Sequence, residues 1–90
     1  MNEELYFIRQ SITTGDISSS VIMWKAGMFS SFLEADEKCR ELFYEFLDGD
    51  RDKHNSIVEE DGFYSVNMFE EGNYIFSWSV WRLTGVERVR

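Results

Sequence analysis

The chain has 90 residues, a formal net charge of −8 and 17% aromatic residues. A chain of this length buries roughly 60% of its unfolded surface, so it can form one core with little margin. The charge argues against nucleic acid as a direct ligand and favours a partner with a basic surface. No apolar run approaches the roughly 18 residues of a membrane span, so we expect no membrane association.

Residues 4–13 and 18–25 are typical of two strands joined by a loop at 14–16. A three-residue loop keeps like side chains opposite each other; it pairs Tyr6 with Trp24, Ile8 with Ile22 and Gln10 with Ser20. A two-residue loop shifts the pairing by one and sets Arg9 opposite Ile22. We therefore predict the three-residue loop.

Residues 31–48 are predicted to form a helix. Ser31 and Glu34 have the spacing of a capping box, and Gly49 is a common residue type just after a helix. Apolar residues recur every three or four positions and predict one buried stripe: Phe32, Ala35, Cys39, Leu42, Phe43 and Phe46. Carboxylates recur in the same way within an arc of roughly 80° on another side: Glu34, Glu37, Glu41, Glu45 and Asp48.

The second half of the chain predicts a second hairpin. A polar loop at 49–55 leads to a short strand at 56–58 and a turn at 59–62. Strands at 63–70 and 74–84 then pair across a loop at 71–73, with Tyr64 opposite Val80, Val66 opposite Trp78 and Met68 opposite Phe76. The tail from residue 85 is expected to fray.

Together these elements predict one α+β domain over residues 1–90. Its order is β-β-α-(β)-β-β, a two-layer sandwich in which one helix packs on one face of an antiparallel sheet of four to five strands. The face expected under the helix holds Tyr6, Ile8, Ile22, Trp24, Tyr64, Val66, Met68, Phe76, Trp78 and Val80.

The opposite face of the sheet is expected to be apolar and open. It would hold several serines together with Phe7, Val21, Met23, Phe63, Phe69, Ile75 and Trp81. An exposed apolar area of this size marks an interface, either a homodimer or a contact with a foreign partner. The alternative is that residues at the strand ends are assigned to the wrong face, or that a loop covers them.

The acidic surface is the second feature that points to function. Residues 34–71 hold 13 acidic and 4 basic residues, a local charge of −9. Lys38 and Arg40 are placed to pair with Glu34 and Asp36 on the helix. The predicted partner-binding residues are Glu34, Glu37, Glu41, Glu45, Asp48, Asp50, Asp52, Glu59, Glu60 and Asp61, with the aromatic residues Phe63 and Trp81. The simpler alternative is a solvated helix face that keeps the protein in solution.

The loop at 48–59 resembles the calcium loop of EF-hand proteins. Asp48, Asp50, Asp52 and Glu59 occupy loop positions one, three, five and twelve. Lys53 replaces the glycine of position six, Asn55 replaces the aliphatic residue of position eight, and the next segment is predicted to be a strand. We therefore expect no metal at this loop.

No residues predict catalysis or a cofactor. Cys39 is the single cysteine and lies on the apolar stripe, so we expect a buried, inert thiol and no disulfide. His54 is the single histidine and lies in a charged loop. The start of the chain lacks the pattern of a signal peptide, which favours a cytoplasmic location.

The sequence therefore predicts a small acidic, non-enzymatic inhibitor that occupies a basic groove of a nucleic-acid-handling protein by nucleic-acid mimicry. In size, charge and lack of catalytic motifs the chain resembles the small inhibitors that bacteriophages make against host enzymes and defence systems. The alternative is a homo-oligomeric module that uses an apolar open sheet face and sequesters a small ligand there. Salt dependence of partner binding would separate the first hypothesis from the second.

Overall fold

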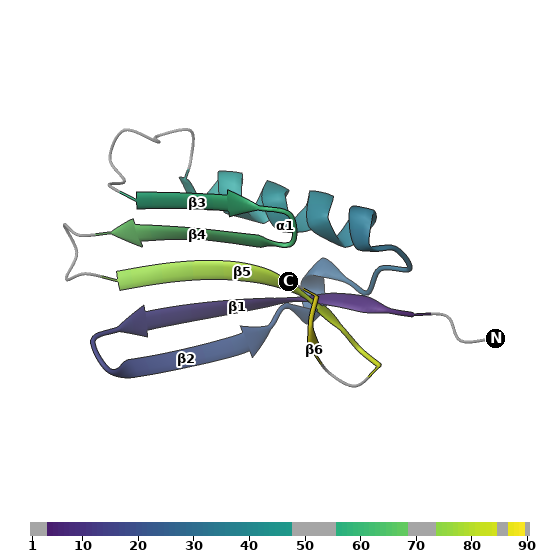
Figure 1. Ribbon diagram of the computed structural model, residues 1–90, viewed down its shortest axis with the longest axis horizontal. Helices are drawn as coiled ribbons and strands as arrows, with labels where there is room; N and C mark the ends of the chain where they lie inside the picture. The colour runs from purple at the N-terminus through teal and green to yellow at the C-terminus, as the bar shows by residue number, and fades with distance from the viewer. Residues whose placement is uncertain (1–3, 48–55, 69–73, 85–86, 90) are drawn as a thin grey trace.

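The computed structural model describes residues 4–47, 56–68, 74–84 and 87–89 (Figure 1). Its elements in chain order are β1 (Tyr6–Thr14), β2 (Ile17–Ile22), the short 3₁₀-helix η1 (Trp24–Ala26), α1 (Phe32–Leu47), β3 (Ser56–Glu60), β4 (Phe63–Met68), β5 (Tyr74–Arg82) and β6 (Glu87–Arg88).

The strands form one antiparallel sheet in the order β2-β1-β5-β4-β3, and β6 pairs with the end of β5. The first and fifth strands pair along their whole lengths, from Tyr6 opposite Arg82 to Thr14 opposite Tyr74. Helix α1 packs on β5, β4 and β1 (Figure 1). The predicted α+β sandwich with one helix is confirmed. In the part of the chain described, no helix has the length and apolar character needed to cross a bilayer.

The helix forms where the apolar and capping patterns predict it. The N–H of Glu34 donates a hydrogen bond of 3.1 Å to Ser31 Oγ, which caps the first turn. The apolar residues that α1 buries recur four positions apart: Ala35, Cys39, Phe43 and Leu47. The ring of Phe43 lies 5.5 Å from the ring of Tyr64 and 5.7 Å from that of Trp78, so the core sits between α1 and the central strands.

The predicted register of the first hairpin is wrong by one residue. Arg9 lies opposite Ile22, and Thr14 lies opposite Ile17 across the two-residue loop Gly15-Asp16. Gly15 has φ +59°, and both common two-residue hairpin turns begin with a positive φ. The rule that like side chains pair across a hairpin fails here because β2 is an edge strand that the helix does not cover. Burial therefore does not select its register.

The predicted register of the second hairpin is wrong by two residues. Tyr64 lies opposite Trp78 and Val66 opposite Phe76, so the connection from Met68 to Tyr74 is longer than the three residues expected. Side chains alternate between faces along a strand, so a shift of two leaves each one on its predicted face. The alternation of apolar and polar residues therefore predicts which face of the sheet each side chain of β4 and β5 lies on. It does not predict which residues of the two strands lie opposite each other.

The predicted covered face is largely confirmed. Tyr6, Ile8, Tyr64, Val66, Trp78 and Val80 are core residues, and Phe76 packs against them. Two assignments are wrong because of the register of the first hairpin. Ile22 lies opposite Arg9, on the face away from α1, and Trp24 lies in η1 with 61% of its surface exposed. The side chain of Met68 is not among those that the structure describes.

The predicted apolar open face is wrong for Val21 and Met23, and Phe7 lies on that face, opposite Trp81, but is not open to solvent. Phe7 is buried, between the rings of Trp24 at 6.1 Å and Trp81 at 6.4 Å. Val21 lies opposite Gln10, on the helix side of β2, and Met23 packs against the core. Ile75, Phe63 and Trp81 do lie on the face away from the helix, and Phe69 is outside the described residues.

Two smaller expectations also change. The strand predicted at 56–58 extends to Glu60, so the turn before β4 narrows to Asp61-Gly62. The tail does not fray at 87–89. Residues 87 and 88 form β6 on β5, and the N–H of Val89 donates a 3.1 Å hydrogen bond to the carbonyl of Val80.

Candidate functional site

The exposed face of α1 carries the predicted row of carboxylates. Glu34, Glu37, Glu41 and Glu45 are all exposed to solvent. At 1.5 Å per residue the row from Glu34 to Glu45 is roughly 16 Å long. Lys38 Nζ lies 3.2 Å from Glu41 Oε1, so this lysine pairs with Glu41 and not with Glu34 as predicted.

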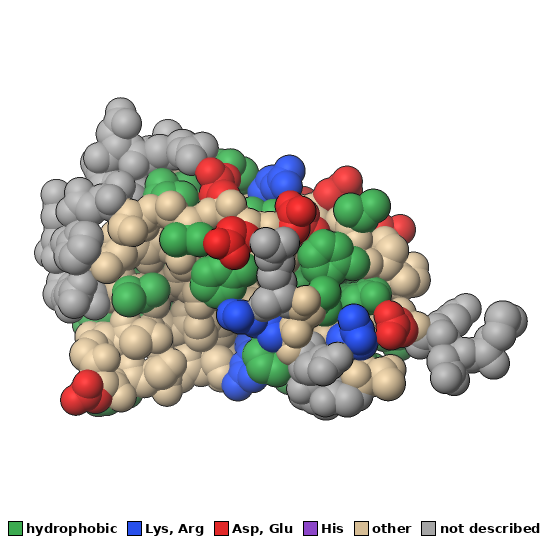
Figure 2. Space-filling view, viewed as in Figure 1, with side chains coloured by type: hydrophobic (Ala, Val, Ile, Leu, Met, Phe, Trp, Pro, Cys, Tyr) green, Lys and Arg blue, Asp and Glu red, His purple; other side chains and the backbone are tan. Residues whose placement is uncertain are grey.

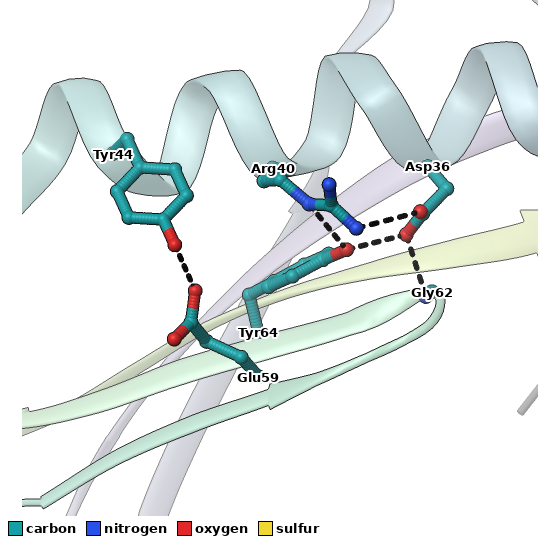
Figure 3. Close-up of polar contacts among 6 residues, drawn as sticks. All are labelled: Asp36, Arg40, Tyr44, Glu59, Gly62 and Tyr64. Carbon is teal, nitrogen blue, oxygen red and sulfur yellow. Dashed lines mark hydrogen bonds and ion pairs between the residues drawn. The ribbon is translucent and has the colours of Figure 1, made fainter.

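A second set of carboxylates lies at the end of β3 and in the turn that follows. Glu59, Glu60 and Asp61 are exposed, and the hydroxyl of Tyr44 on α1 donates a hydrogen bond to the Glu59 carboxylate (Figure 3). A groove of about 250 Å³ separates the helix from this strand; it is lined by Arg40, Tyr44, Glu59, Glu60, Asp61 and Tyr64. The carboxylates that line this groove therefore come from residues 59–61, and the helix contributes Arg40 and Tyr44 to it.

The floor of this groove is fixed by a buried carboxylate. Asp36 Oδ1 accepts hydrogen bonds from the N–H of Gly62 at 2.7 Å and from the hydroxyl of Tyr64 at 2.6 Å (Figure 3). Arg40 Nη2 lies 3.6 Å from Asp36 Oδ2, which confirms the predicted helical ion pair. Asp36 is 5% exposed, so it acts as a structural link between α1 and β4 and not as part of the acidic surface.

The environment of Tyr64 keeps its hydroxyl protonated. Burial raises the pKa of Tyr64 to about 12, and the hydrogen bond that it donates to Asp36 adds to this rise. Arg40 Nε in turn donates to the Tyr64 oxygen at 3.3 Å, and this contact raises the pKa of the guanidinium. The groove floor therefore holds one fixed arrangement of charges at neutral pH.

The structure does not bring all the predicted partner-binding residues together. Phe63 and Trp81 lie on the face of the sheet away from α1, so they are separate from the acidic groove. Asp48, Asp50 and Asp52 lie outside the described residues, and so do His54 and most of the calcium-like loop. The absence of calcium binding at that loop stays a prediction.

A feature that sequence reasoning missed occupies the sheet face opposite the helix. A hollow of about 230 Å³ is lined by Arg9, Ser11, Ser18, Ser20, Phe63, Ser77, Ser79, Trp81 and Arg88. Figure 2 looks onto this face, where Lys and Arg side chains gather near the centre beside a broad area of other polar and backbone atoms. The available signal was the group of serines in β2 and β5, which includes Ser18, Ser20, Ser77 and Ser79.

The thiol is placed as predicted. Cys39 is fully buried, and burial together with the nearby Asp36 raises its pKa to about 12. A thiol that keeps its proton at neutral pH is a poor nucleophile. Within the described ranges, no three His, Cys, Asp or Glu side chains are grouped so that they could hold a metal ion.

Comparison with known protein families, curated proteins and solved structures found no match for this chain.

Proposed function

We propose that the chain is a non-enzymatic inhibitor whose acidic groove and helix face occupy the basic surface of a nucleic-acid-handling protein. One observation carries the proposal: α1 carries exposed carboxylates and also forms one wall of a groove whose other wall holds the carboxylates of Glu59, Glu60 and Asp61. A partner with lysines and arginines spaced for phosphate groups meets a matching arrangement of negative charge here.

The spacing of the charges supports mimicry of a nucleic acid strand. Glu34, Glu37, Glu41 and Glu45 place four carboxylates along roughly 16 Å of helix, about one charge per 5 Å. One strand of DNA carries about one charge per 3.4 Å of its axis. The carboxylates of Glu59, Glu60 and Asp61 add further negative charge at the groove beside the helix.

The rigidity of the surface also supports the proposal. The helix is tied to β4 through the buried Asp36, and Tyr44 is tied to Glu59 across the groove. A surface that is already in its bound geometry loses less conformational entropy on association than a mobile acidic tail. A solvated helix face that serves only solubility needs no such link to the second set of carboxylates.

The test is capture of partners from a bacterial lysate, followed by affinity measurements on what is captured. Wild-type protein should retain a nucleic-acid-binding protein at low salt, release it at high salt, and lose it to added duplex DNA. The triple variant Glu37→Lys, Glu41→Lys and Glu45→Lys should slow association roughly tenfold or more.

A matched pair of single variants controls for net charge. Glu45→Lys changes an exposed residue of the helix row, and Asp16→Lys makes the same change of charge in the exposed β1–β2 turn. Only the first should weaken binding, with thermal melts as the control for folding. Equal affinity of wild type and the triple variant, with equal melts, would contradict the proposal.

A second candidate is a homodimer formed through β2. This strand is an edge of the sheet, it has the uncharged sequence ISSSVI, and Ile17 and Val21 are 71% and 59% exposed. The other edge strand, β3, carries Glu59 and Glu60, which oppose pairing with a second β3. Antiparallel pairing of two β2 strands is therefore the edge contact that the charges favour.

A further inference from the structure

The hollow on the sheet face opposite α1 gathers positive charge in an acidic protein. Two arginines and five serines line it, and none of its lining residues carries a carboxylate. Elsewhere in the described ranges, three cations lie within 4 Å of a carboxylate: Lys38 of Glu41, Arg40 of Asp36 and Arg82 of Glu4. The two arginines of the hollow instead lie over aromatic rings.

The guanidinium of Arg9 is held in place by uncharged groups. It lies 4.7 Å from the centre of the Trp81 ring, and its Nε and Nη2 donate hydrogen bonds of 2.9 and 2.6 Å to Ser20 Oγ. A guanidinium has five N–H donors, so three remain for a further acceptor. The ring and the hydroxyl therefore orient this group and leave its charge to a ligand.

The guanidinium of Arg88 reaches the same hollow from the other side. Arg88 lies opposite Trp81 in the β5–β6 pair, and its guanidinium lies 5.2 Å from the centre of the Phe63 ring. Each cation therefore covers one aromatic face of the hollow. This leaves less ring surface on which a nucleobase could stack.

The serines supply hydroxyls between the two cations. The hydroxyls of Ser11 and Ser77 are hydrogen-bonded to each other, and Ser79 Oγ accepts a 2.9 Å hydrogen bond from Trp81 Nε1. Ser79 Oγ also donates a 3.4 Å hydrogen bond to the carbonyl of Arg9. A hydroxyl rotates to donate or to accept, so the Ser11–Ser77 pair can turn a proton toward an anion. Two cations with several hydroxyls suit a group that has three acceptor oxygens and two negative charges.

We propose that this hollow, built around Arg9, Arg88, Ser77 and Ser79, binds the phosphate group of a small phosphate monoester. Its volume is below the roughly 300–1,000 Å³ of pockets that enclose drug-sized ligands, so it holds the phosphate and few other atoms. The remote acidic row does not prevent this, because charges farther away than about 8 Å are largely screened at physiological ionic strength.

The experiment titrates the 90-residue chain with three probes: inorganic phosphate, ribose 5-phosphate and acetate. Binding is followed by NMR of the three tryptophan indole N–H signals. Trp81 Nε1 donates to a serine of the hollow, whereas Trp24 and Trp78 do not line it. Phosphate and ribose 5-phosphate should shift the Trp81 signal selectively, and acetate should not.

Three variants locate the site. Arg9→Gln and Arg88→Gln should each weaken phosphate binding roughly tenfold or more, because each removes charge-assisted hydrogen bonds. Lys25→Gln removes one positive charge outside the hollow and should leave the affinity within about twofold. Arg88 belongs to the two-residue strand β6, so its variant keeps the test valid if Arg9→Gln does not fold.

The outcomes separate the sources of the phosphate. Tighter binding of ribose 5-phosphate supports an organic phosphate ester as the ligand. Equal binding of both phosphates supports recognition of the phosphate group alone. If inorganic phosphate binds and ribose 5-phosphate does not, the site takes the free ion, and the proposal of a monoester is overturned. Binding of acetate as strong as that of phosphate, no shift at millimolar phosphate, or affinities that both arginine variants leave unchanged would overturn the proposal.

Discussion

The hydroxyl of Tyr64 donates a 2.6 Å hydrogen bond to the buried carboxylate of Asp36, and this contact ties α1 to β4. The same carboxylate accepts the N–H of Gly62 at the start of that strand. One side chain therefore links the helix to the β3–β4 turn and to β4. The acidic groove between α1 and β3 depends on this geometry.

Asp36→Ala should lower the free energy of unfolding by roughly 2–4 kcal/mol, because it leaves the Gly62 N–H and the Tyr64 hydroxyl without their acceptor. Urea unfolding followed by tryptophan fluorescence measures the change. Glu37→Ala is the matched control: it removes the neighbouring exposed carboxylate and should cost within about 0.5 kcal/mol. Equal losses in the two variants would show that Asp36 has no structural role.

Gly62→Ala should destabilise the fold more than Gly15→Ala. Both glycines have positive φ, +80° and +59°, so both substitutions strain the backbone. A Cβ at Gly62 would also lie 2.9 Å from the ring of Phe32, whereas no atom lies within 4 Å of one at Gly15. Thermal melts should show the larger decrease for Gly62→Ala, and a smaller one would mean that Phe32 moves away freely.

Phe43→Ala should cost roughly 3–5 kcal/mol, as truncations of fully buried aromatic residues do. The Phe43 ring is fully buried and contacts both Tyr64 and Trp78. Phe46 is half-buried against Phe76 at 4.7 Å, so Phe46→Ala should cost less. Denaturant unfolding of the two variants measures which loses more stability. A larger loss for Phe46→Ala would show that the centre of the core does not lie at Phe43.

Stability should fall as the pH rises above 9. The ordinary pKa of a thiol is 9.0, and burial raises that of Cys39 to about 12. Between these values the unfolded chain releases the thiol proton and the folded chain keeps it, so the unfolded state is favoured as pH rises. Below pH 9 both states keep the proton, and this group adds no pH dependence.

The variant Cys39→Ala checks the alkaline prediction. Urea unfolding from pH 8 to 11 should give a shallower decline for this variant than for wild type. The cavity left by the substitution lowers the free energy of unfolding by the same amount at every pH. The informative quantity is therefore the slope of that free energy against pH. Tyr64 titrates in the same range in both proteins and cancels in the comparison. Identical slopes would show that the Cys39 pKa is not raised in the folded state.

The helix and the fold class were predictable from sequence because their signals are local. The cap at Ser31 and the apolar stripe through Phe43 act within a few residues of each other. The faces of β4 and β5 were predictable for the same reason, since alternation of side chains is local. The alignment of Tyr64 with Trp78 was not, because a shift of two residues keeps every face unchanged.

The serine-lined hollow was not predictable because it depends on strand order. Arg9 and Trp81 are distant in sequence, and they meet because β1 pairs with β5 and not only with β2. Arg88 reaches the hollow only because the tail adds β6 to β5. By contrast, the acidic row was visible in the sequence, since exposed charges on one helix face follow the helical period.

Association through β2 is the last prediction. A β2–β2 dimer predicts a solution mass of twice the 10.7 kDa of the chain at high concentration. Pairing about a two-fold axis places Val21 of one copy beside residues 17–19 of the other. Val21→Lys should therefore give a monomer, because edge lysines are costly to bury against a second strand. The residue is 59% exposed, so the fold should keep its melting temperature.

Val58→Lys is the matched control for this prediction. It places the same charge on β3, the opposite edge of the sheet, and should leave the dimer intact. Sedimentation equilibrium of the three proteins distinguishes the outcomes. A dimer that Val58→Lys breaks and Val21→Lys does not would move the interface to β3, although Glu59 and Glu60 of two copies would then repel each other. A monomeric wild type at millimolar concentration would remove the homodimer and leave the acidic groove as the surface on which association depends.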